Sequence, residues 1–386
     1  MRAVPSRLLA MVVVLSLAFW ASTRRVEAAF AFEYRVVDVG DLGGAGATTG
    51  TAINEGGVVA GVSPLAAGTS HAFWSVGGVA HDLGSLVGPG GSSQARGIND
   101  SGQTTGTSLA STGFEHAFLA GADGSMRDLG VLPGMAWSQG RDLNASGQVV
   151  GTSGHFGGVS MAFITNLDGE MMKLPGLPEG SSSRAEGINA SGVVTGAYNA
   201  SGSFRAFRTA PGGTIEDLGT VAGLFQSFGL AINDDGQVTG KATNSFGGSS
   251  LAFVSRSEGG LLSLGTLAGT VASEGLGINN HGHVVGTAFL PGSLGSLAFL
   301  WTEQGGMIDL NTLIDPVEGW TLLSASGIND AGQIVGTGRI GGQTRAFLLD
   351  PFNSIPVPAP PALVLLGIGA ACLGQRKLRA PRAANR

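Results

Sequence analysis

The fold is decided by the stretch SSQARGINDSGQTTG, residues 92–106, because versions of it return seven times along the chain. Its marker is an aliphatic residue, an asparagine, two variable residues and a glycine. Successive asparagines stand 45, 45, 45, 44, 46 and 50 residues apart, at Asn54, Asn99, Asn144, Asn189, Asn233, Asn279 and Asn329. A period of roughly 20–50 residues indicates a solenoid or a propeller built from one repeated supersecondary unit.

Two further markers recur in step with the asparagine. An Ala-Phe pair precedes each next unit, with phenylalanines at Phe73, Phe118, Phe163, Phe207, Phe253, Phe299 and Phe347. A step related to Asp-Leu-Gly follows it, with leucines at Leu42, Leu83, Leu129, Leu174, Leu218, Leu264 and Leu310. We interpret the phenylalanines as core residues between neighbouring units.

Each unit predicts four short strands. Residues 92–98 alternate small and apolar side chains, as a half-buried strand does. The tetrapeptide Asn-x-x-Gly is typical of a tight antiparallel turn, because Asn hydrogen-bonds nearby backbone and Gly accepts a left-handed conformation. Strands resembling QVVG, HAFLA and a DLG segment follow. Four strands in about 45 residues is the size of a propeller blade.

The two ends of the repeat array favour a closed ring. The first unit is preceded by YRVVDVGDLG, residues 34–43, whereas the last unit stops at RAFLLD, residues 345–350, without a DLG step of its own. Pairing these segments completes one blade and leaves no unpaired terminal edge. We therefore predict an all-β, seven-bladed β-propeller over residues 29–350. An open β-solenoid is the alternative, although it requires capping repeats.

Composition and charge exclude several partners. The chain has 67 glycines and only 12% charged residues, which fits many short strands joined by turns. Residues 29–355 carry 12 Lys or Arg against 26 Asp or Glu, a net charge of −14. Such a body repels nucleic acid and anionic membrane surfaces. The single cysteine, Cys372, excludes an intrachain disulfide.

Residues 1–28 are typical of a secretory signal peptide. Arg2 and Arg7 precede an apolar run, and small residues follow it, so cleavage between Ala28 and Ala29 by signal peptidase is expected. An uncleaved N-terminal membrane anchor is the alternative. Both interpretations imply export.

The C-terminal segment predicts a second membrane signal. Residues 351–361 form a proline-rich linker, and residues 362–386 are expected to form a short apolar helix with a basic tail. The apolar run, residues 362–374, is shorter than the roughly 20 residues of a stable spanning helix. It suits transient insertion into the inner membrane, with Arg376, Lys377 and Arg379 on the cytoplasmic side. A permanent tail anchor is the alternative.

The repeat pattern "HAF…DLG…IN..G.VVG" resembles the bacterial HAF extracellular repeat of exported proteins. The resemblance covers nearly all of residues 32–350, and implies location more than activity. The histidine of that pattern is present only at His71 and His116. The other units have Met161, Arg205, Leu251, Leu297 and Arg345 in its place, which argues against a catalytic role for it.

The C-terminus resembles the PEP-CTERM family of sorting signals. Val357, Pro358, Ala359 and Pro360 stand where that family has Pro-Glu-Pro, and are also close to its VPLPA variant. The resemblance implies recognition by a membrane exosortase and delivery to the bacterial envelope or surface. Ala359 replaces the acidic residue and leaves the sortase subtype open.

Sites of chemistry are sparse in the repeats. His281 and His283 form an H-x-H pair, but they lie beside a repeat turn without a third ligand, so a solvated turn is the better interpretation. Asp234 and Asp235 lack the spaced carboxylates of a calcium loop. We predict no metal, no cofactor and no catalytic residue.

Trp137, Phe225 and Trp320 all lie between a DLG step and the next asparagine, on connections that share one face of a ring. Exposed rings there could stack on sugars. The expected function is that of an exported, non-catalytic binding or matrix module, with a polysaccharide or a cell-surface protein as partner. A glycan hydrolase or lyase is the alternative and would need converging acidic residues.

Overall fold

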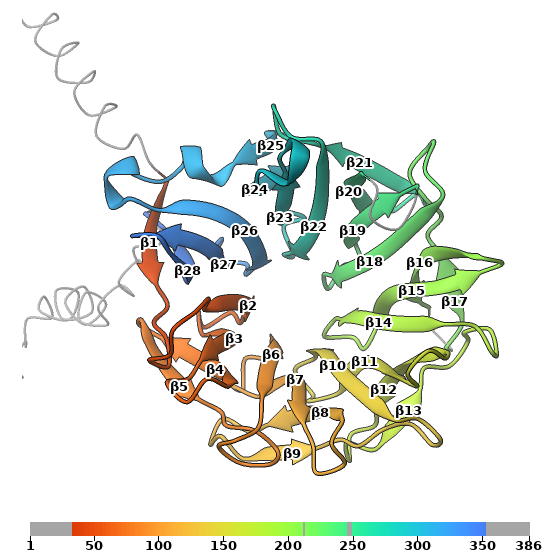
Figure 1. Cartoon of the computed structure of the whole chain (residues 1–386). Coiled ribbons are helices and arrows are strands. Elements are labelled where there is room, and N and C mark those ends of the chain that lie inside the picture. The colour runs from red at the N-terminus through yellow and green to blue at the C-terminus, as the bar shows by residue number, and fades with distance from the viewer. Residues whose placement is uncertain (1–32, 211–212, 245–248, 353–386) are drawn as a thin grey trace, which may run out of the picture. The chain divides into compact units, whose positions relative to one another are not determined.

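The computed structural model describes residues 33–352, except residues 211–212 and 245–248. Its 28 strands form seven four-stranded antiparallel sheets arranged as blades around a ring (Figure 1). This confirms the predicted seven-bladed β-propeller. In the part of the chain that is described, no helix is long and apolar enough to cross a membrane.

Each blade uses four strands in chain order from the centre outward, and blade 7 takes its outermost strand from the N-terminal end. Blades 1 to 3 comprise β2 (Thr49–Ile53), β3 (Val59–Pro64), β4 (Ser70–Val76), β5 (Val79–Asp82), β6 (Ser93–Ile98), β7 (Thr104–Leu109), β8 (Glu115–Ala120), β9 (Met126–Asp128), β10 (Trp137–Leu143), β11 (Val149–Gly154), β12 (Ser160–Thr165) and β13 (Met171–Lys173). Blades 4 to 7 comprise β14 (Ser183–Ile188), β15 (Val194–Ala200), β16 (Ser203–Thr209), β17 (Ile215–Asp217), β18 (Gln226–Ile232), β19 (Val238–Thr243), β20 (Ser250–Ser255), β21 (Leu261–Gly265), β22 (Ala272–Ile278), β23 (Val284–Phe289), β24 (Ser296–Thr302), β25 (Gly306–Asp309), β26 (Thr321–Ile328), β27 (Ile334–Ile340), β28 (Gln343–Pro351) and β1 (Tyr34–Asp38).

The ring closes as the sequence predicts. Strand β1 pairs antiparallel with β28, from Tyr34 opposite Pro351 to Asp38 opposite Phe347. The first and last strands of the array therefore share one blade, seen side by side in Figure 1. Every edge strand that a linear array would expose at its ends is thereby paired.

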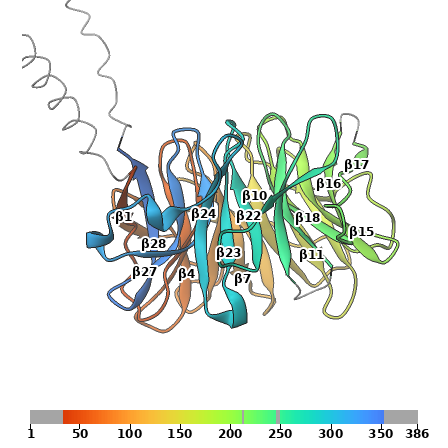
Figure 2. The same cartoon turned by 90° about the horizontal axis from the view of Figure 1, so that it is seen from above.

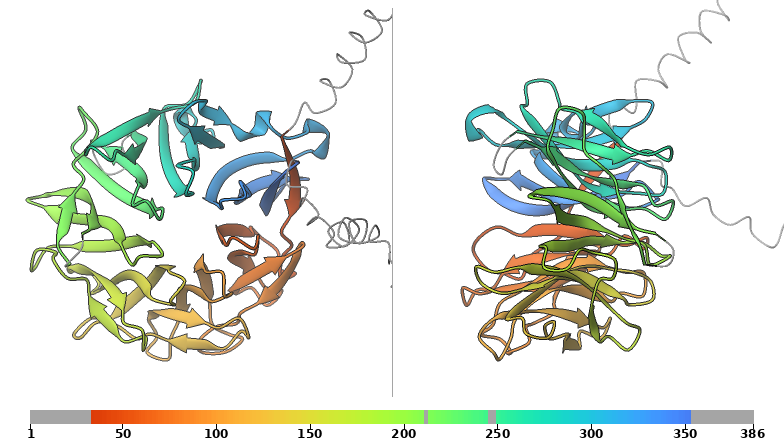
Figure 3. Two further views of the ribbon diagram at one scale, coloured as in Figure 1. Left: turned by 180° about the vertical axis from the view of Figure 1, so that it is seen from behind. Right: turned by 90° about the vertical axis from the view of Figure 1, so that its right-hand side faces the viewer.

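The ring has two faces, visible edge-on in Figure 2 and from behind in Figure 3. The Asn face carries the seven Asn-x-x-Gly turns that join the first and second strands of each blade. The connection face carries the loops between blades and the loops between the second and third strands. Because the strands alternate in direction, every connection between blades returns to the same face.

The Asn-x-x-Gly turn forms for the expected reason. Gly102 has φ +77°, and its N–H donates to the carbonyl of Asn99 at 3.0 Å. The side-chain Oδ1 of Asn99 accepts the N–H of Gln103 at 2.9 Å. All seven repeat asparagines accept the same bond from the fourth residue on. Glycine meets the left-handed geometry without steric cost.

The asparagine also joins blades, which its sequence did not predict. The Nδ2 of Asn233 donates to the carbonyl of Asn279, in the next blade, at 3.0 Å. Six of the seven asparagines of the described ring make this bond, and Asn329 closes the circle onto Asn54. Asn144 makes none to its neighbour and donates to Gln148 instead. The amides are buried, so each bond lies where water competes little.

The repeated phenylalanines form the core between blades, as expected. All seven are 0% exposed. Five of the seven rings pack over a glycine in the second strand of their own blade: a Cβ on Gly151 would lie 2.8 Å from the Phe163 ring. Burial of one such ring contributes about 1.5–3 kcal/mol. The glycine is required here for space and not for its dihedral angles.

The junction between blades 6 and 7 explains the longest repeat spacing. Two short 3₁₀ helices, η2 (Leu310–Thr312) and η3 (Pro316–Glu318), occupy the connection, and η1 (Pro291–Ser293) lies in a loop of blade 6. Asn311 of η2 exchanges two hydrogen bonds with the backbone of Leu322 at the start of blade 7. These bonds fix the start of blade 7 against blade 6.

The inter-blade amide bond has a measurable share in stability. We expect Asn233→Ala to lower the free energy of unfolding by about 1 kcal/mol more than Asn144→Ala, because both lose the turn bond but only Asn233 also bonds the next blade. Urea denaturation of both variants measures the difference. Equal losses would contradict a stabilising role for the bond between blades.

Candidate functional site: the central channel

Seven innermost strands surround the axis of the ring, which is called the central channel here: β2, β6, β10, β14, β18, β22 and β26 (Figures 1 and 3). At the Asn face it opens into a cavity of about 440 Å³. Seven aliphatic side chains line this cavity, and they come from the residues just before the repeat asparagines: Ile53, Ile98, Leu143, Ile188, Ile232, Ile278 and Ile328. The asparagines and the residues after them form its rim.

Carboxylates make this rim acidic and bind blades together. Asp100 accepts the N–H of Glu55 at 2.9 Å, and Asp330 accepts the N–H of Asn280 at 2.8 Å. The Glu55 carboxylate accepts the N–H of Asp330 at 3.1 Å, and Asp234 accepts the N–H of Ala190 at 3.0 Å. Burial raises the pKa of Glu55, and the charges of Asp330, Asp100 and Asp234 add to the effect against the bond from the Asp330 amide. The described residues contain no group of three or more side chains fit to hold a metal ion.

A second belt of side chains faces the channel at the third residue before each asparagine, called position −3 here. A side chain on Gly140, at −4, would meet Thr105 of the preceding blade, and one on Gly97, at −2, would meet Asp142 of the following blade. The register shift between −4 and −2 turns the residue between them toward the channel. The residues at position −3 are Thr51, Arg96, Arg141, Glu186, Leu230, Leu276 and Ser326 in blades 1 to 7. The residue type differs between neighbouring blades except between blades 2 and 3 and between blades 5 and 6.

Three arginines from consecutive blades lie in or beside this belt. Arg96 and Arg141 occupy position −3 of blades 2 and 3, and Arg184 stands at −5 of blade 4. Burial and the neighbouring charge of Arg141 lower the pKa of Arg96, with opposition from Glu186 and Glu115. Burial also lowers the pKa of Arg184, where Glu186 opposes and Arg141 adds to the effect. The charge of Arg141 thus acts on both Arg96 and Arg184.

Neighbouring groups hold the arginines in place. Arg96 donates to Gln94 and Arg141 to Gln139, each at 2.9 Å, so an identical Gln-x-Arg unit recurs in two blades. Glu186 lies 3.6 Å from Arg141 and 3.7 Å from Arg184. The Arg184 guanidinium stacks over the rings of Phe228 and Phe204 at 4.6 and 5.4 Å, distances at which a cation and a ring attract.

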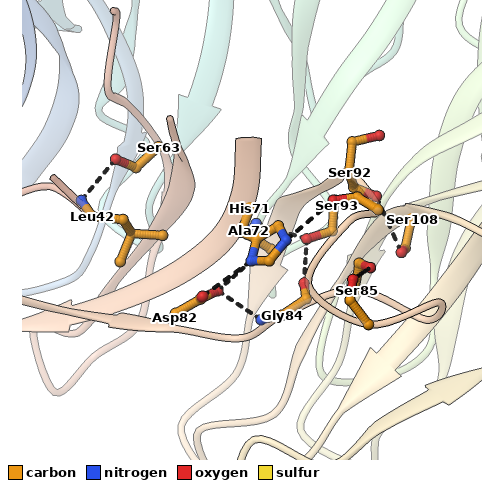
Figure 4. A network of polar contacts seen from close by, with 12 residues as sticks. Leu42, Ser63, His71, Ala72, Asp82, Gly84, Ser85, Ser92, Ser93 and Ser108 are labelled. Carbon is orange, nitrogen blue, oxygen red and sulfur yellow. Dashed lines mark hydrogen bonds and ion pairs between the residues drawn. The ribbon is translucent and has the colours of Figure 1, made fainter. Parts of the chain in front are cut away.

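His71 and His116 each belong to a His-Asp-Ser arrangement that resembles a catalytic triad but is structural, and Figure 4 shows the one at His71. His71 bonds Asp82 through Nδ1 at 2.8 Å, and its Nε2 lies 3.1 Å from the carbonyl of Gly91. Ser93 donates to the carbonyl of Gly84 and accepts the N–H of Ala72 at 2.8 Å. The polar atoms are therefore used to join blade 1 to blade 2. Four further serines accept the equivalent amide across later blade junctions: Ser138, Ser183, Ser227 and Ser273.

The three aromatic residues singled out from the sequence lie at the start of the innermost strands, in blades 3, 5 and 7. Phe225 is 66% exposed and Trp137 is half-buried. Trp320 is only 9% exposed and packs edge-on against Phe347. No two of the three belong to neighbouring blades, so the structure does not bring them together. Their role in sugar binding stays a prediction.

A pair of exposed aromatic rings, Phe114 and Phe156, was not predicted from the sequence. Phe114 and Phe156 lie on loops of blades 2 and 3 at the connection face, with ring centroids 5.2 Å apart. They are 43% and 70% exposed. Glu115, the next residue after Phe114, accepts a bond from Gln139 at 3.1 Å, which in turn bonds Arg141. The ring pair is thus connected to the arginines through two hydrogen bonds.

The remaining sequence-based sites give no further cluster. His281 and His283 lie with ring centroids 5.8 Å apart, and burial lowers the pKa of His283, assisted by His281. The cleavage site at Ala28 and Ala29 and the sorting residues Val357–Pro360, Arg376, Lys377 and Arg379 lie outside the described residues.

Comparison with known proteins supports the fold alone. No protein-family model and no curated protein matches the sequence. Among solved structures, puromycin hydrolase matches over 81% of this chain and 52% of its own at 16% identity, with a TM-score of 0.50. The β-propeller domain of the Trilobed protease from Pyrococcus furiosus matches over 83% of this chain and 95% of its own at 10% identity, with a TM-score of 0.49. TolB from Acinetobacter baumannii matches over 65% of this chain and 62% of its own at 13% identity, with a TM-score of 0.46.

These neighbours are propeller proteins or contain propellers, and they include hydrolases and a protease. This chain spans about half the length of puromycin hydrolase and 62% of the TolB chain. Identities this low carry no activity across, because one fold hosts many functions.

Asp142, in the wall of the channel, predicts a specific pH dependence. It stands at position −2, where the other blades have Ala or Gly, and its carboxylate accepts the amides of Leu143 and Ile188 at 2.8 and 3.0 Å. Burial raises the pKa of Asp142 to about 6, against the two hydrogen bonds. The folded state therefore binds a proton that the unfolded chain releases at a lower pH.

We expect this group to lower stability by on the order of 2 kcal/mol as pH rises from about 4 to about 6, because the native state binds more protons over this range. Asp142→Ala, which copies Ala52 and Ala231, should remove that part of the dependence. Urea denaturation at several pH values measures it. A constant difference between the two proteins would show that Asp142 does not titrate with a raised pKa.

Proposed function

We propose that the protein is an exported binding or matrix module that holds a polysaccharide on the connection face of its propeller, over blades 2 and 3. The observation that carries the proposal is the exposed ring pair of Phe114 and Phe156 beside the arginine belt. Paired aromatic rings open to solvent are uncommon without a partner, since burying them is favourable. A cell-surface protein is the other partner class that such a surface suits.

Trp137 extends the same surface. It begins the innermost strand of blade 3 and packs over Gly154, two residues before Phe156. Three aromatic side chains thus belong to one pair of neighbouring blades. Flat rings in this arrangement suit the apolar faces of sugar rings, while the glutamine and arginine side chains of the same blades suit sugar hydroxyls.

Export and sorting are part of the proposal. The signal peptide of residues 1–28 would be removed by signal peptidase, and the C-terminal segment would hold the protein transiently in the inner membrane. An exosortase-like enzyme would then recognise Val357–Pro360 and release the propeller to the envelope or cell surface. The acidic body favours this role over one on nucleic acid.

A glycan hydrolase or lyase is the second candidate, and one observation favours it. Glu55, Asp100, Asp234 and Asp330 surround one cavity, and burial raises the pKa of Glu55, as it does for general acids. Against this, each of these carboxylates already accepts a backbone N–H of a neighbouring blade. The same oxygens serve ring closure, so we place binding first.

The binding proposal predicts loss of retention on polysaccharide. The full chain, mixed with the extracellular polysaccharide of its producing organism, should co-sediment, and Phe114→Ala/Phe156→Ala should bind about thirtyfold more weakly, since each of the two exposed rings contributes about 1 kcal/mol. Trp137→Ala and Phe225→Ala measure how much the other two rings contribute to binding. Leu167→Ala is the control, because Leu167 is also an exposed apolar residue but lies on the Asn face.

The outcomes separate the candidates. Loss in the ring variants with the control unaffected supports the proposal. Release of reducing ends or unsaturated sugars by the wild type, abolished by Glu55→Gln, would favour the enzyme instead. Equal retention of all variants would exclude the connection face as the binding surface.

Sorting predicts a change in mass. In the producing organism, the wild type should lose its C-terminal segment, whereas Pro358→Ala/Pro360→Ala should keep it and remain in the membrane fraction. Mass spectrometry of both fractions measures this. A wild type that stays in the membrane at full C-terminal length would support the permanent tail anchor and overturn sorting.

A further inference from the structure

The arginine cluster of the channel consists of Arg96, Arg141 and Arg184. Its guanidinium groups have more N–H donors than there are hydrogen-bond acceptors beside them. A guanidinium has five N–H donors. Within the described residues, the guanidinium of Arg184 makes no hydrogen bond, and Arg96 and Arg141 make one each. The Nε atoms of Arg141 and Arg184 are buried without a hydrogen-bond partner, and their nearest acceptors are the Glu186 oxygens with which they form ion pairs at 3.6 and 3.7 Å. Partly buried donors without acceptors cost free energy, and a ligand that accepts from them recovers it.

We propose that Arg96, Arg141 and Arg184 form a binding site for the carboxylate of a uronic acid residue. The inference rests on the proposed function and names the sugar that this surface recognises. Planar carboxylates accept two parallel hydrogen bonds from a guanidinium, which makes arginine the usual residue for this recognition. Glu186 is the carboxylate closest to the cluster, and it lies 3.6 Å or more from both of the arginines that it faces.

The charges around the cluster leave it positive. Glu186 and Glu115 are the acidic groups that act on Arg96, and Glu115 is already bonded to Gln139. Glu274, the one acidic residue at position −5 of the seven described blades, is paired with Lys241 at 2.7 Å on the far blades. Three guanidinium groups therefore face two carboxylates. The net charge of −14 over residues 29–355 makes this positive spot a local exception.

The same net charge limits the ligand. A long polyanion would carry many charges past an acidic surface, and beyond roughly 10 Å the arginines no longer offset that repulsion at ordinary salt. A sugar chain with isolated or terminal uronates brings one carboxylate to the arginines and leaves neutral rings for Phe114 and Phe156. Saccharide is favoured over peptide because these exposed rings belong to the same two blades as Arg96 and Arg141.

The two Gln-x-Arg units prepare the site in advance. Each glutamine holds one guanidinium nitrogen by a bond of 2.9 Å, so the arginine loses less freedom when a ligand binds. Opposite them, position −3 has Leu230 and Leu276, and Thr51 and Ser326 complete the belt. The charged side of the channel thus faces an apolar side, which orients a ligand whose carboxylate projects from a sugar ring.

Calorimetric titration of the full chain tests the site with three probes: a tetrasaccharide ending in glucuronate, its methyl ester, and the neutral glucose tetrasaccharide. We expect the glucuronate probe to bind at least tenfold more tightly than its ester. Arg141→Gln and Arg96→Gln should each remove about tenfold of that affinity while binding of the ester stays unchanged. Arg127→Gln is the control, because Arg127 bonds only the carbonyl of Asp168 away from the channel.

Other results would contradict the proposed uronate site. Equal affinity for acid and ester, or a loss in Arg127→Gln as large as in Arg141→Gln, would overturn the site. Two short peptides, one with a free and one with an amidated C-terminus, test the other source of a carboxylate, and tighter binding of the free peptide than of glucuronate would overturn the sugar assignment. If polysaccharide is retained through Phe114 and Phe156 but the ester binds as well as the acid, the proposed function stands and this inference fails.

Discussion

The amide of the repeat asparagine is the contact on which the ring depends. Its oxygen closes the turn of its own blade, and its nitrogen bonds the backbone of the next blade in six of seven junctions of the described ring. A propeller has no sheet that runs through all blades, and this chain has no intrachain disulfide. Cohesion between blades must therefore come from buried phenylalanines and from polar bonds such as these. One residue type links local turn geometry to closure.

Sequence could predict whatever is decided within one repeat. The turn follows from the chemistry of Asn99 and Gly102, the blade from the spacing of the markers, and closure from the displaced first and last strands. The bonds from Asn233 to Asn279, and from Ser93 to the backbone of the preceding blade, depend on residues that only the ring brings together. Their residue types were visible, but their partners were not.

The candidate site was hidden for the same reason. The alternation of small and apolar residues in the innermost strand predicts a regular strand. It gives no sign of the β-bulge that turns the residue at position −3 toward the channel. The sequence analysis selected Trp137, Phe225 and Trp320 by their place in the connections between blades. It therefore missed Phe114 and Phe156, which lie on other loops of the same face. Aligning the repeats on the asparagine would have shown a position where Arg96, Glu186 and Leu230 differ within one ring.

That variation separates the roles of the positions. A ring of identical blades would have a channel with sevenfold symmetry, which would offer an asymmetric ligand seven equivalent orientations and select none of them. Here the residues that hold blades together repeat, while position −3 changes from arginine in blades 2 and 3 to leucine in blades 5 and 6. Like charges placed side by side lower stability, and nothing in ring closure requires Arg96 beside Arg141, because serine and leucine serve equally at that position elsewhere. A place where the fold tolerates repulsion without a structural return is therefore a place where a ligand has much to contribute.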